Sequence, residues 1–435
     1  MNPSPSAAKF GALRHRDFTL FLCARFLATV AVQMQSVAVG WQVYALTSDP
    51  LDLGLVGLAQ FAPFVPLALV AGHAADRFDR RRIVALCFVV EMLCGLALIG
   101  FTLAGPRAIW PVFAVMALYG SARAFMMPAS QAVVINLVPS DTFSNALALN
   151  SSAFQIAVIT GPALGGFLYL AGPEAVYRTV VALLAIASLL MGWLGSGPRD
   201  RAKPRPMSLS TVLEGLRFVW SRPVVLGAIS LDLFAVLFGG ATALLPAYAS
   251  DVLHVGPTGL GLLRTAPGLG ASLTALVLAF WPIRRRVGYW MFGGVGLFGA
   301  ASLALGLSDS YALALAALAL MGAGDMVSVY IRHMLVQLET PDAIRGRVSA
   351  VNSVFIGASN ELGEFESGLT AGWFGLVPAI VVGGCATLMV ALFWMFGFRE
   401  LRAMDEFPRQ VREPCPRPRP KPRLTRTSRK RRRGG

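Results

Sequence analysis

The stretch LVPSDTFSNALALNSSAF, at residues 137–154, decides the fold, because a related stretch, LETPDAIRGRVSAVNSVF, recurs at residues 338–355. The two align without gaps at an offset of 201 residues, share four identical positions, and each precedes a long apolar run. Three consecutive arginines at 80–82 also recur at 284–286, at the similar offset of 204 residues. Two independent matches at nearly one spacing predict a duplicated unit, which is an architecture of membrane transporters.

Apolar runs of about twenty residues extend in both directions from these stretches, and each is long enough to cross about 30 Å of hydrocarbon. Only 14% of the 435 residues are charged and the mean hydropathy is +0.62, whereas about a quarter of the residues of a soluble domain are charged. We therefore predict an all-α membrane protein with twelve transmembrane helices in two pseudo-symmetric six-helix bundles. The predicted spans are 18–45, 51–75, 83–104, 109–130, 143–171, 174–195, 223–249, 257–281, 288–306, 310–333, 348–373 and 375–397.

Lysine and arginine residues orient the predicted bundle. Leaving out the C-terminal tail, the loops on one side hold eighteen of them, and the loops on the other side hold two, Arg107 and Arg178. The positive-inside rule then places the basic side and both termini in the cytoplasm, and we expect the membrane to be the cell inner membrane. The predicted domains are an N-terminal bundle at 1–195, a cytoplasmic linker at 196–222, a C-terminal bundle at 223–400 and a disordered basic tail at 401–435.

The predicted tail alternates proline with basic residues from Arg417 to Arg423 and carries five consecutive basic residues at 429–433. Proline and like charges prevent a packed core, so we expect disorder. Anionic lipid is the expected partner of this tail and of the basic loops. Because residues 408–433 hold no aromatic side chains on which bases could stack, we expect no nucleic-acid partner.

A short basic segment, GHAADRFDRRR at residues 72–82, joins the second and third predicted spans. Gly72 allows two helices to approach closely, Asp76 is suited to capping the amides of a neighbouring helix, and the arginines are suited to anchoring at anionic lipid. A solvated basic loop that only sets the topology is the alternative interpretation.

This segment resembles the loop signature of the major facilitator superfamily, G-x-x-x-D-R-x-G-R-R/K, with Asp79 in place of the second glycine. In that family the loop braces the two halves of the protein and controls their rocking. The resemblance implies a major facilitator fold, and it implies the gating role for Gly72, Asp76, Arg77 and Arg80.

Two further stretches carry the resemblance. In the fifth span, TGPALGG at residues 160–166 is similar to the exporter-associated pattern G-x-x-x-G-P-x-x-G-G, with Ala157 at its first glycine. Gly161 and Gly165 form a small face for close helix packing and Pro162 bends the helix, so generic packing and an exporter-specific role both stay open. The segments WQVYALT (41–47), LGLVGL (53–58) and QFAP (60–63) resemble the branch of enterobactin exporters and transmembrane secretion effectors.

Beyond the first five residues of each predicted span, ten charged side chains fall inside the spans, and each would cost about 2.5–3.5 kcal/mol if it faced lipid. Most must therefore face a wet cavity or one another. They are Glu91, Asp232, Asp325, Glu361, Glu364 and Glu366 among the acids, and Arg25, Arg123, Arg264 and Arg332 among the bases.

The acids of the eleventh span cluster in the segment NELGEFE, residues 360–366. Glu361 and Glu364 share a helix face, whereas Glu366 points elsewhere. Burial and like-charge crowding favour the protonated form of at least one of them, which makes these three glutamates candidates for proton coupling. A structural ion pair with Arg123 or Arg332 is the alternative.

Helices one, four, seven and ten line the central cavity in the major facilitator superfamily. The resemblance therefore implies substrate contact or a gating ion pair for polar residues of these spans, and we expect Arg123 and Asp325 to matter most. The candidates are Arg25, Gln33, Arg123, Asp232, Asp325 and Arg332.

These features predict a secondary transporter that exports a small siderophore-, drug- or metabolite-like molecule by alternating access in exchange for protons. The sequence has no G-x-x-x-x-G-K-[ST] loop, His-Glu-x-x-His or Gly-x-Ser-x-Gly pattern, so we expect no enzyme activity, cofactor or metal. The expected partners are the substrate, protons and anionic lipids, and the expected state is a monomer. Alternatives are an importer or lysophospholipid flippase on the same fold, or a non-transporting sensor or scaffold that signals through the tail.

Overall fold

The computed structural model describes residues 11–105, 108–139, 141–195, 209–341 and 344–408, and within these ranges its regular elements are helices. A chain this apolar has to satisfy its backbone hydrogen bonds inside helices, because hydrocarbon supplies no partners. Ten helices are long and apolar enough to cross a membrane. Helices α3 and α14, of 28 and 30 residues, complete the twelve predicted spans.

The first six spans are α2 to α7, preceded by the short turn η1 and with η2 between the last two. Their bounds are η1 (Gly11–Arg14), α2 (Arg16–Thr47), α3 (Pro50–Arg77), α4 (Arg80–Leu103), α5 (Trp110–Leu137), α6 (Phe143–Leu168), η2 (Tyr169–Ala171) and α7 (Pro173–Gly192).

The second six spans follow the short helix α8, and the first of them is broken. The bounds are α8 (Leu209–Ser221), α9 (Pro223–Phe238), η3 (Gly240–Leu244), α10 (Leu245–Asp251), α11 (Pro257–Phe280), α12 (Val287–Gly306), α13 (Tyr311–Glu339), α14 (Arg345–Phe374), α15 (Leu376–Gly397) and α16 (Arg399–Ala403). The break between α9 and α10 follows the pair Gly239–Gly240, a sequence at which helices commonly deform.

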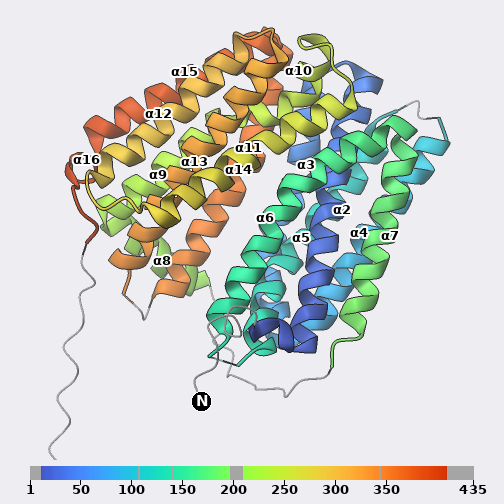
Figure 1. Cartoon of the computed structure of the whole chain (residues 1–435), viewed down its shortest axis with the longest axis horizontal. Coiled ribbons are helices and arrows are strands. Elements are labelled where there is room, and N and C mark those ends of the chain that lie inside the picture. The colour runs from blue at the N-terminus through green and yellow to red at the C-terminus, as the bar shows by residue number, and fades with distance from the viewer. Residues whose placement is uncertain (1–10, 106–107, 140, 196–208, 342–343, 409–435) are drawn as a thin grey trace, which may run out of the picture.

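The helices form two groups, α2–α7 and α9–α15, which stand beside each other in Figure 1. In the first group α3 packs on α5, α4 packs on α5 and α7, and α2 packs on α6 and α7. The equivalent helices of the second group, counted along the chain, make the same pairings: α11 with α13, α12 with α13 and α15, and α9 with α14 and α15. This repetition confirms the two pseudo-symmetric six-helix bundles.

The outer surface of both groups is apolar. Phe167, Phe280 and Phe393 are 65%, 71% and 68% exposed, which would be unfavourable in water and is expected where lipid is the solvent. Helix α8, in the second part of the predicted linker, packs on α9 and α14. There Arg347 forms an ion pair with Glu214. The first part of that linker, 196–208, and the tail beyond 408 lie outside the described residues.

The two groups meet along two equivalent seams, α3 against α14 and α6 against α11. We name the end at which α2 begins and α3 ends the basic end, because Arg80–Arg82 lie there, and the opposite end the far end. The closest approaches of the seams lie toward the far end: a Cβ atom added at Gly54 would lie 3.0 Å from Cα of Gly368, and one added at Gly166 would lie 2.9 Å from Cα of Gly261.

A hydrogen bond from the Tyr44 hydroxyl to the Asp251 carboxylate also joins the two groups at the far end. Glycine is required at the closest points because a side chain would separate the backbones. The two groups are therefore in close contact at the far end.

Candidate transport cavity

A cavity of about 540 Å³ lies between the two groups and is lined by residues of both. Helices α2 to α6 form most of its wall, and η3, α11 and α14 form the rest. The lining reaches toward the basic end at Phe21 and Arg25 of α2 and at Gln131 of α5. The volume falls within the range of about 300–1,000 Å³ that is usual for small-molecule sites.

The cavity wall combines charged, amide and apolar groups. The charged and amide side chains in the wall are Arg25, Gln33, Gln35, Gln60, Glu91, Arg123, Gln131, Arg264, Asn360, Glu361 and Glu364. Large apolar side chains stand between them: Phe21, Phe88, Phe154, Met116, Met126 and Met127. Such a lining is suited to an amphiphilic molecule of moderate size, with a few polar groups to fix its orientation.

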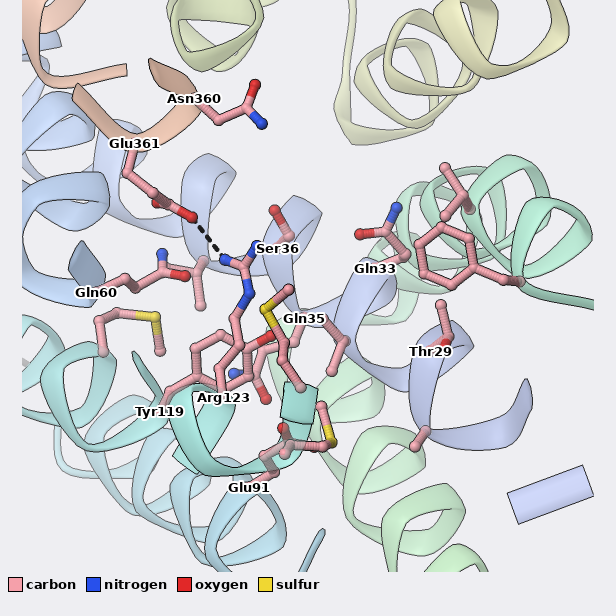
Figure 2. A pocket seen from close by; sticks show the side chains of 18 of the residues that line it. Thr29, Gln33, Gln35, Ser36, Gln60, Glu91, Tyr119, Arg123, Asn360 and Glu361 are labelled. Carbon is pink, nitrogen blue, oxygen red and sulfur yellow. Dashed lines mark hydrogen bonds and ion pairs between the residues drawn. The ribbon is translucent and has the colours of Figure 1, made fainter. Parts of the chain in front are cut away.

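Arg123 and Glu361 form an ion pair that crosses the cavity from one group to the other. The Nη1 atom of Arg123, on α5, donates to Oε1 of Glu361, on α14, over 2.5 Å, and Figure 2 shows the pair within the cavity. The Glu361 side chain is 13% exposed and that of Arg123 is 38% exposed. A charge-assisted hydrogen bond in such surroundings is stronger than one in water.

Glu364 lies one helical turn farther along α14, on the same face, and also lines the cavity. A Cβ atom added at Gly57 of α3 would lie 2.8 Å from its Oε2 atom, so this carboxyl group occupies the α3–α14 seam. Glu366 does not line the cavity, and it accepts a hydrogen bond of 2.8 Å from the Thr370 hydroxyl. Helical spacing predicted that Glu361 and Glu364 share a face of the helix and that Glu366 lies on another, and the structure agrees.

Two more arginines stand in the cavity wall, and their hydrogen bonds there go to neutral side chains. Nη1 of Arg25 donates to Oδ1 of Asn150 over 3.0 Å, and its guanidinium group lies over the Phe154 ring. Nη1 of Arg264 donates to Oγ of Ser36 over 2.5 Å, from α11 to α2, and its Nε atom is buried without a hydrogen-bond partner. Arg264 therefore joins the two groups at the cavity, a role that the sequence did not identify.

Glu91, on α4, is the second cavity residue that the sequence did not single out. Its side chain is 1% exposed, and neither carboxyl oxygen has a hydrogen-bond partner among the described residues. Both Glu91 and Arg264 belong to the ten charged residues inside the predicted spans, and this cost of burial was the signal that could have found them.

Asp232, Asp325 and Arg332 lie elsewhere, in the interior of the second group. Arg332 of α13 forms an ion pair with Asp232 of α9, and their side chains are 3% and 5% exposed. Asp232 and Asp325 line a separate pocket of about 10 Å³, too small for a substrate. They are absent from the lining of the large cavity because their faces of α9 and α13 turn toward each other. A substrate or gating role for these three residues stays a prediction.

The glycine–proline segment of α6 packs on two neighbours. A Cβ atom added at Gly165 would lie 2.8 Å from Cα of Met34 on α2, and one added at Gly161 would lie 2.5 Å from Cβ of Gln33. On the other side, a Cβ atom added at Gly261 of α11 would lie 2.6 Å from the carbonyl oxygen of Pro162. The segment therefore allows close packing both within the first group and across the seam.

The predicted gating loop lies at the basic end. Arg77 ends α3 and is exposed, and Arg80 begins α4 and is half-buried. Asp79, at the position where this loop departs from the family signature, caps α4 by accepting a hydrogen bond of 3.0 Å from the Arg81 amide. Gly72 and Asp76 belong to α3, but the structure does not describe the surroundings of Gly72 or the side chain of Asp76, so the gating role stays a prediction.

Comparison with known proteins agrees with this architecture. Residues 7–430 match the family model described as transmembrane secretion effector. The enterobactin exporter EntS of Escherichia coli O1:K1 is 28% identical over 415 residues, which cover 91% of this chain and 95% of that protein. That of Citrobacter koseri is 28% identical over 412 residues, which cover 91% of this chain and 94% of that protein.

Solved structures show the same fold. The D323A mutant of the nucleoside transporter NupG has a TM-score of 0.70 at 14% identity, and the match covers 88% of this chain and all of that chain. A bacterial homologue of the iron transporter ferroportin, solved in an inward-facing state, has a TM-score of 0.66 at 15% identity, over 89% and 99% of the two chains. With twelve spans in two related bundles around a central cavity, and a family match over nearly its whole length, the chain belongs to the transmembrane secretion effector family of major facilitator superfamily transporters.

Proposed function

We propose that this transporter exports a siderophore-, drug- or metabolite-like molecule by alternating access in exchange for protons. The observation that carries the proposal is the Arg123–Glu361 ion pair, which links the two groups inside the cavity. An ion pair at that place ties the relative position of the two groups to the charge of one carboxyl group.

The closed far end supports alternating access. Tyr44 with Asp251, and the glycine approaches of both seams, hold the groups together there, while the cavity lining reaches toward the basic end. After loading from the basic end, release of the substrate at the far end requires these contacts to open. The pseudo-symmetry makes the two seams equivalent. In this proposal the protein lies in the cell inner membrane with its basic end facing the cytoplasm, because the basic loops lie at that end.

Glu361 and Glu364 are the proposed coupling acids. Glu361 holds Arg123 and so ties the two groups together in this conformation, whereas Glu364 occupies the seam against Gly57. Release of Arg123 from Glu361 loosens that tie. A ligand moves such an equilibrium only by binding one conformation more tightly, and a proton is a ligand in this sense. One charge crossing the membrane supplies about 2.3 kcal/mol per 100 mV, which is enough to drive export against a concentration gradient.

The substrate class follows from the cavity. A volume of about 540 Å³ with aromatic, methionine, arginine and amide side chains is suited to a drug-sized amphiphilic molecule. Relatives at 28% identity are named enterobactin exporters, and enterobactin is therefore the first compound to test.

The experiment has two stages. Metabolites of cells with and without the protein are compared, and any compound retained in cells that lack it is then used in everted vesicles, with enterobactin as the first probe. We expect uptake into the vesicles to rise when their interior is made acidic and to fall when a protonophore collapses the gradient. Flux of the identified compound that is unchanged by the collapse would contradict proton exchange.

A further inference from the structure

Glu91 is the most deeply buried acid in the cavity wall. It lies at the middle of α4, between the basic and far ends, and both of its carboxyl oxygens lack a hydrogen-bond partner among the described residues. An unpaired carboxylate in such a place costs several kcal/mol, and a buried group of this kind takes up a proton instead of staying charged. In this conformation Glu91 therefore holds a proton.

Arg123, on the neighbouring helix α5, is a basic group whose charge acts on Glu91. Figure 2 shows Glu91 and Glu361 on opposite sides of Arg123 in the view. Glu91 and Arg123 belong to the same group of helices, whereas Glu361 belongs to the other. Arg123 thus stands between an acid that moves with it and an acid that moves with the second group.

The contacts between α14 and α3 indicate how Glu361 moves when the far end opens. Glu361 lies one turn from Glu364, which contacts α3 at Gly57, and two turns from Gly368, which contacts α3 at Gly54. Opening the far end separates α14 from α3 at both contacts. The movement carries Glu361 away from α5, and Arg123 is left in the first group with Glu91 as the remaining buried acid beside it.

We propose that Arg123 exchanges partners between Glu361 and Glu91 as the transporter changes conformation, and that Glu91 carries a proton while Glu361 holds Arg123. The inference rests on the alternating access proposed above and deepens it: Glu91 carries the proton, and Glu361 couples it to the movement by holding or releasing Arg123. With the far end closed, Glu91 is neutral and Arg123 pairs with Glu361. With the far end open, Glu91 loses its proton and pairs with Arg123.

The direction of this exchange fits export. Protonation of Glu91 favours the closed far end and the cavity that reaches toward the basic end, which is the conformation in which a cytoplasmic substrate would bind. Loss of the proton favours opening of the far end, and an external proton then resets the cycle. Proton and substrate therefore cross in opposite directions.

The other titratable groups around Glu91 are few. Cys87 and Cys94 on α4 and Tyr119 on α5 interact with it electrostatically. Glu361 and Glu364 of α14, Arg25 of α2 and Arg264 of α11 line the same cavity. Helix α7 packs on α4 from behind, and its titratable groups, Glu174, Tyr177 and Arg178, lie in its first two turns at the far end. Glu361 and Glu364 are the groups whose titration has to be separated from that of Glu91.

The test measures conformation without any substrate. Spin labels at Leu46→Cys on α2 and Leu307→Cys after α12 report the far-end distance between the groups, since both positions are exposed at that end, at 47% and 73%. The exposed Cys23 and Cys385, together with Cys415 of the tail, are replaced by serine, while the buried Cys87 and Cys94 stay. Distances are recorded by double electron–electron resonance in lipid nanodiscs across a pH series.

One linked proton changes the ratio of two conformations by at most about ten-fold per pH unit. We expect the far-end-open fraction of the parent protein to rise with pH toward that slope. In Glu91→Gln, which resembles the protonated acid at every pH, the far end should stay closed and most of the slope should disappear. In Glu361→Gln, which removes the partner in the closed conformation, the open fraction should increase and the slope should remain. Glu174→Gln changes a half-buried acid outside the cavity that pairs with Arg178; it is the matched control and should behave as the parent.

Several results would overturn the inference. They are a Glu91→Gln curve that superimposes on the parent curve, a shift of the two variants in the same direction, or a single far-end distance at every pH. If Glu91→Gln does not fold, two other variants decide the question: Glu91→Asp, which keeps the titratable carboxyl group and should keep the slope, and the independent Glu361→Gln. The proposed function is tested separately by flux under a pH gradient, so failure of coupled transport and failure of the partner exchange give different results.

Discussion

The α3–α14 seam allows the closed far end to be tested with a single methyl group. Gly368 of α14 faces Gly54 of α3, and a Cβ atom added at Gly368 would lie 2.6 Å from Cα and 2.8 Å from the backbone nitrogen of Gly54. Carbon atoms in contact normally lie about 3.5–4.0 Å apart, so Gly368→Ala has to open the seam by about 1 Å. The contacted atoms belong to the backbone, which cannot move aside as a flexible side chain would.

The magnitude follows from this overlap. Forcing an extra methyl group into close packing costs about 1–3 kcal/mol, and the cost falls on the far-end-closed conformation. Such an energy corresponds to a shift of about 5- to 150-fold toward the far-end-open conformation. Gly372→Ala is the control on the same helix, because its Cβ atom would lie 3.4 Å from Cβ of Leu51, at an ordinary contact distance.

The assay is the far-end distance between labels at Leu46 and Leu307, measured at one fixed pH for both alanine variants and the parent protein. We expect Gly368→Ala to populate the longer distance and Gly372→Ala to match the parent. Equal distance distributions in all three proteins, with Gly368→Ala eluting as a monodisperse peak in gel filtration, would refute the argument that this glycine contact closes the far end.

Two further predictions concern stability, and a third concerns the C-terminal tail. Asp232→Asn leaves Arg332 buried without its charged partner and should lower stability by about 3–5 kcal/mol, with partial recovery when Arg332→Gln is added, measured by thermal unfolding in detergent. Asp79→Ala removes the cap from the Arg81 amide and should cost about 1 kcal/mol in the same assay, whereas Asp141→Ala, as a comparison, should cost less. Deletion of residues 409–435 should leave vesicle flux unchanged, whereas a function that signals through the tail should be lost; loss of flux would contradict the expectation that transport does not need the tail.

The spans and their duplication could be predicted because both follow from local properties of the chain. A run of about twenty apolar residues crosses the membrane whatever its neighbours are, and the repeat at offset 201 implied that the helix pairings of one half would recur in the other. The break of the seventh span was not predicted. Gly239 and Gly240 lie within an apolar run that looks continuous. In the structure Gly240 faces the backbone of Gly363 on α14, and Gly239 faces the Phe298 ring on α12.

The faces of the polar helices were harder to predict. Arg123 was expected in the cavity and lies there, opposite Glu361, and the ion pair was one of the two roles considered for that acid. Asp325 was expected beside it but lies in a small pocket within the second group. Helical spacing tells which residues share a face, but it does not tell whether that face turns toward the cavity or toward a neighbouring helix.

The sequence by itself determined that this chain is a membrane protein of two related halves, because hydropathy, basic residues and repeats are properties that no tertiary contact alters. It also identified ten charges that could not face lipid. Only the tertiary structure decided how those charges are distributed: Arg123 with Glu361 across the cavity, Arg332 with Asp232 in the interior, and Glu91 without a hydrogen-bond partner in the part of the chain that the structure describes. The reason is physical, since the cost of burying a charge depends on which helix stands opposite it, and that is set by packing between segments that are far apart in the chain, 238 residues for Arg123 and Glu361 and 100 residues for Arg332 and Asp232.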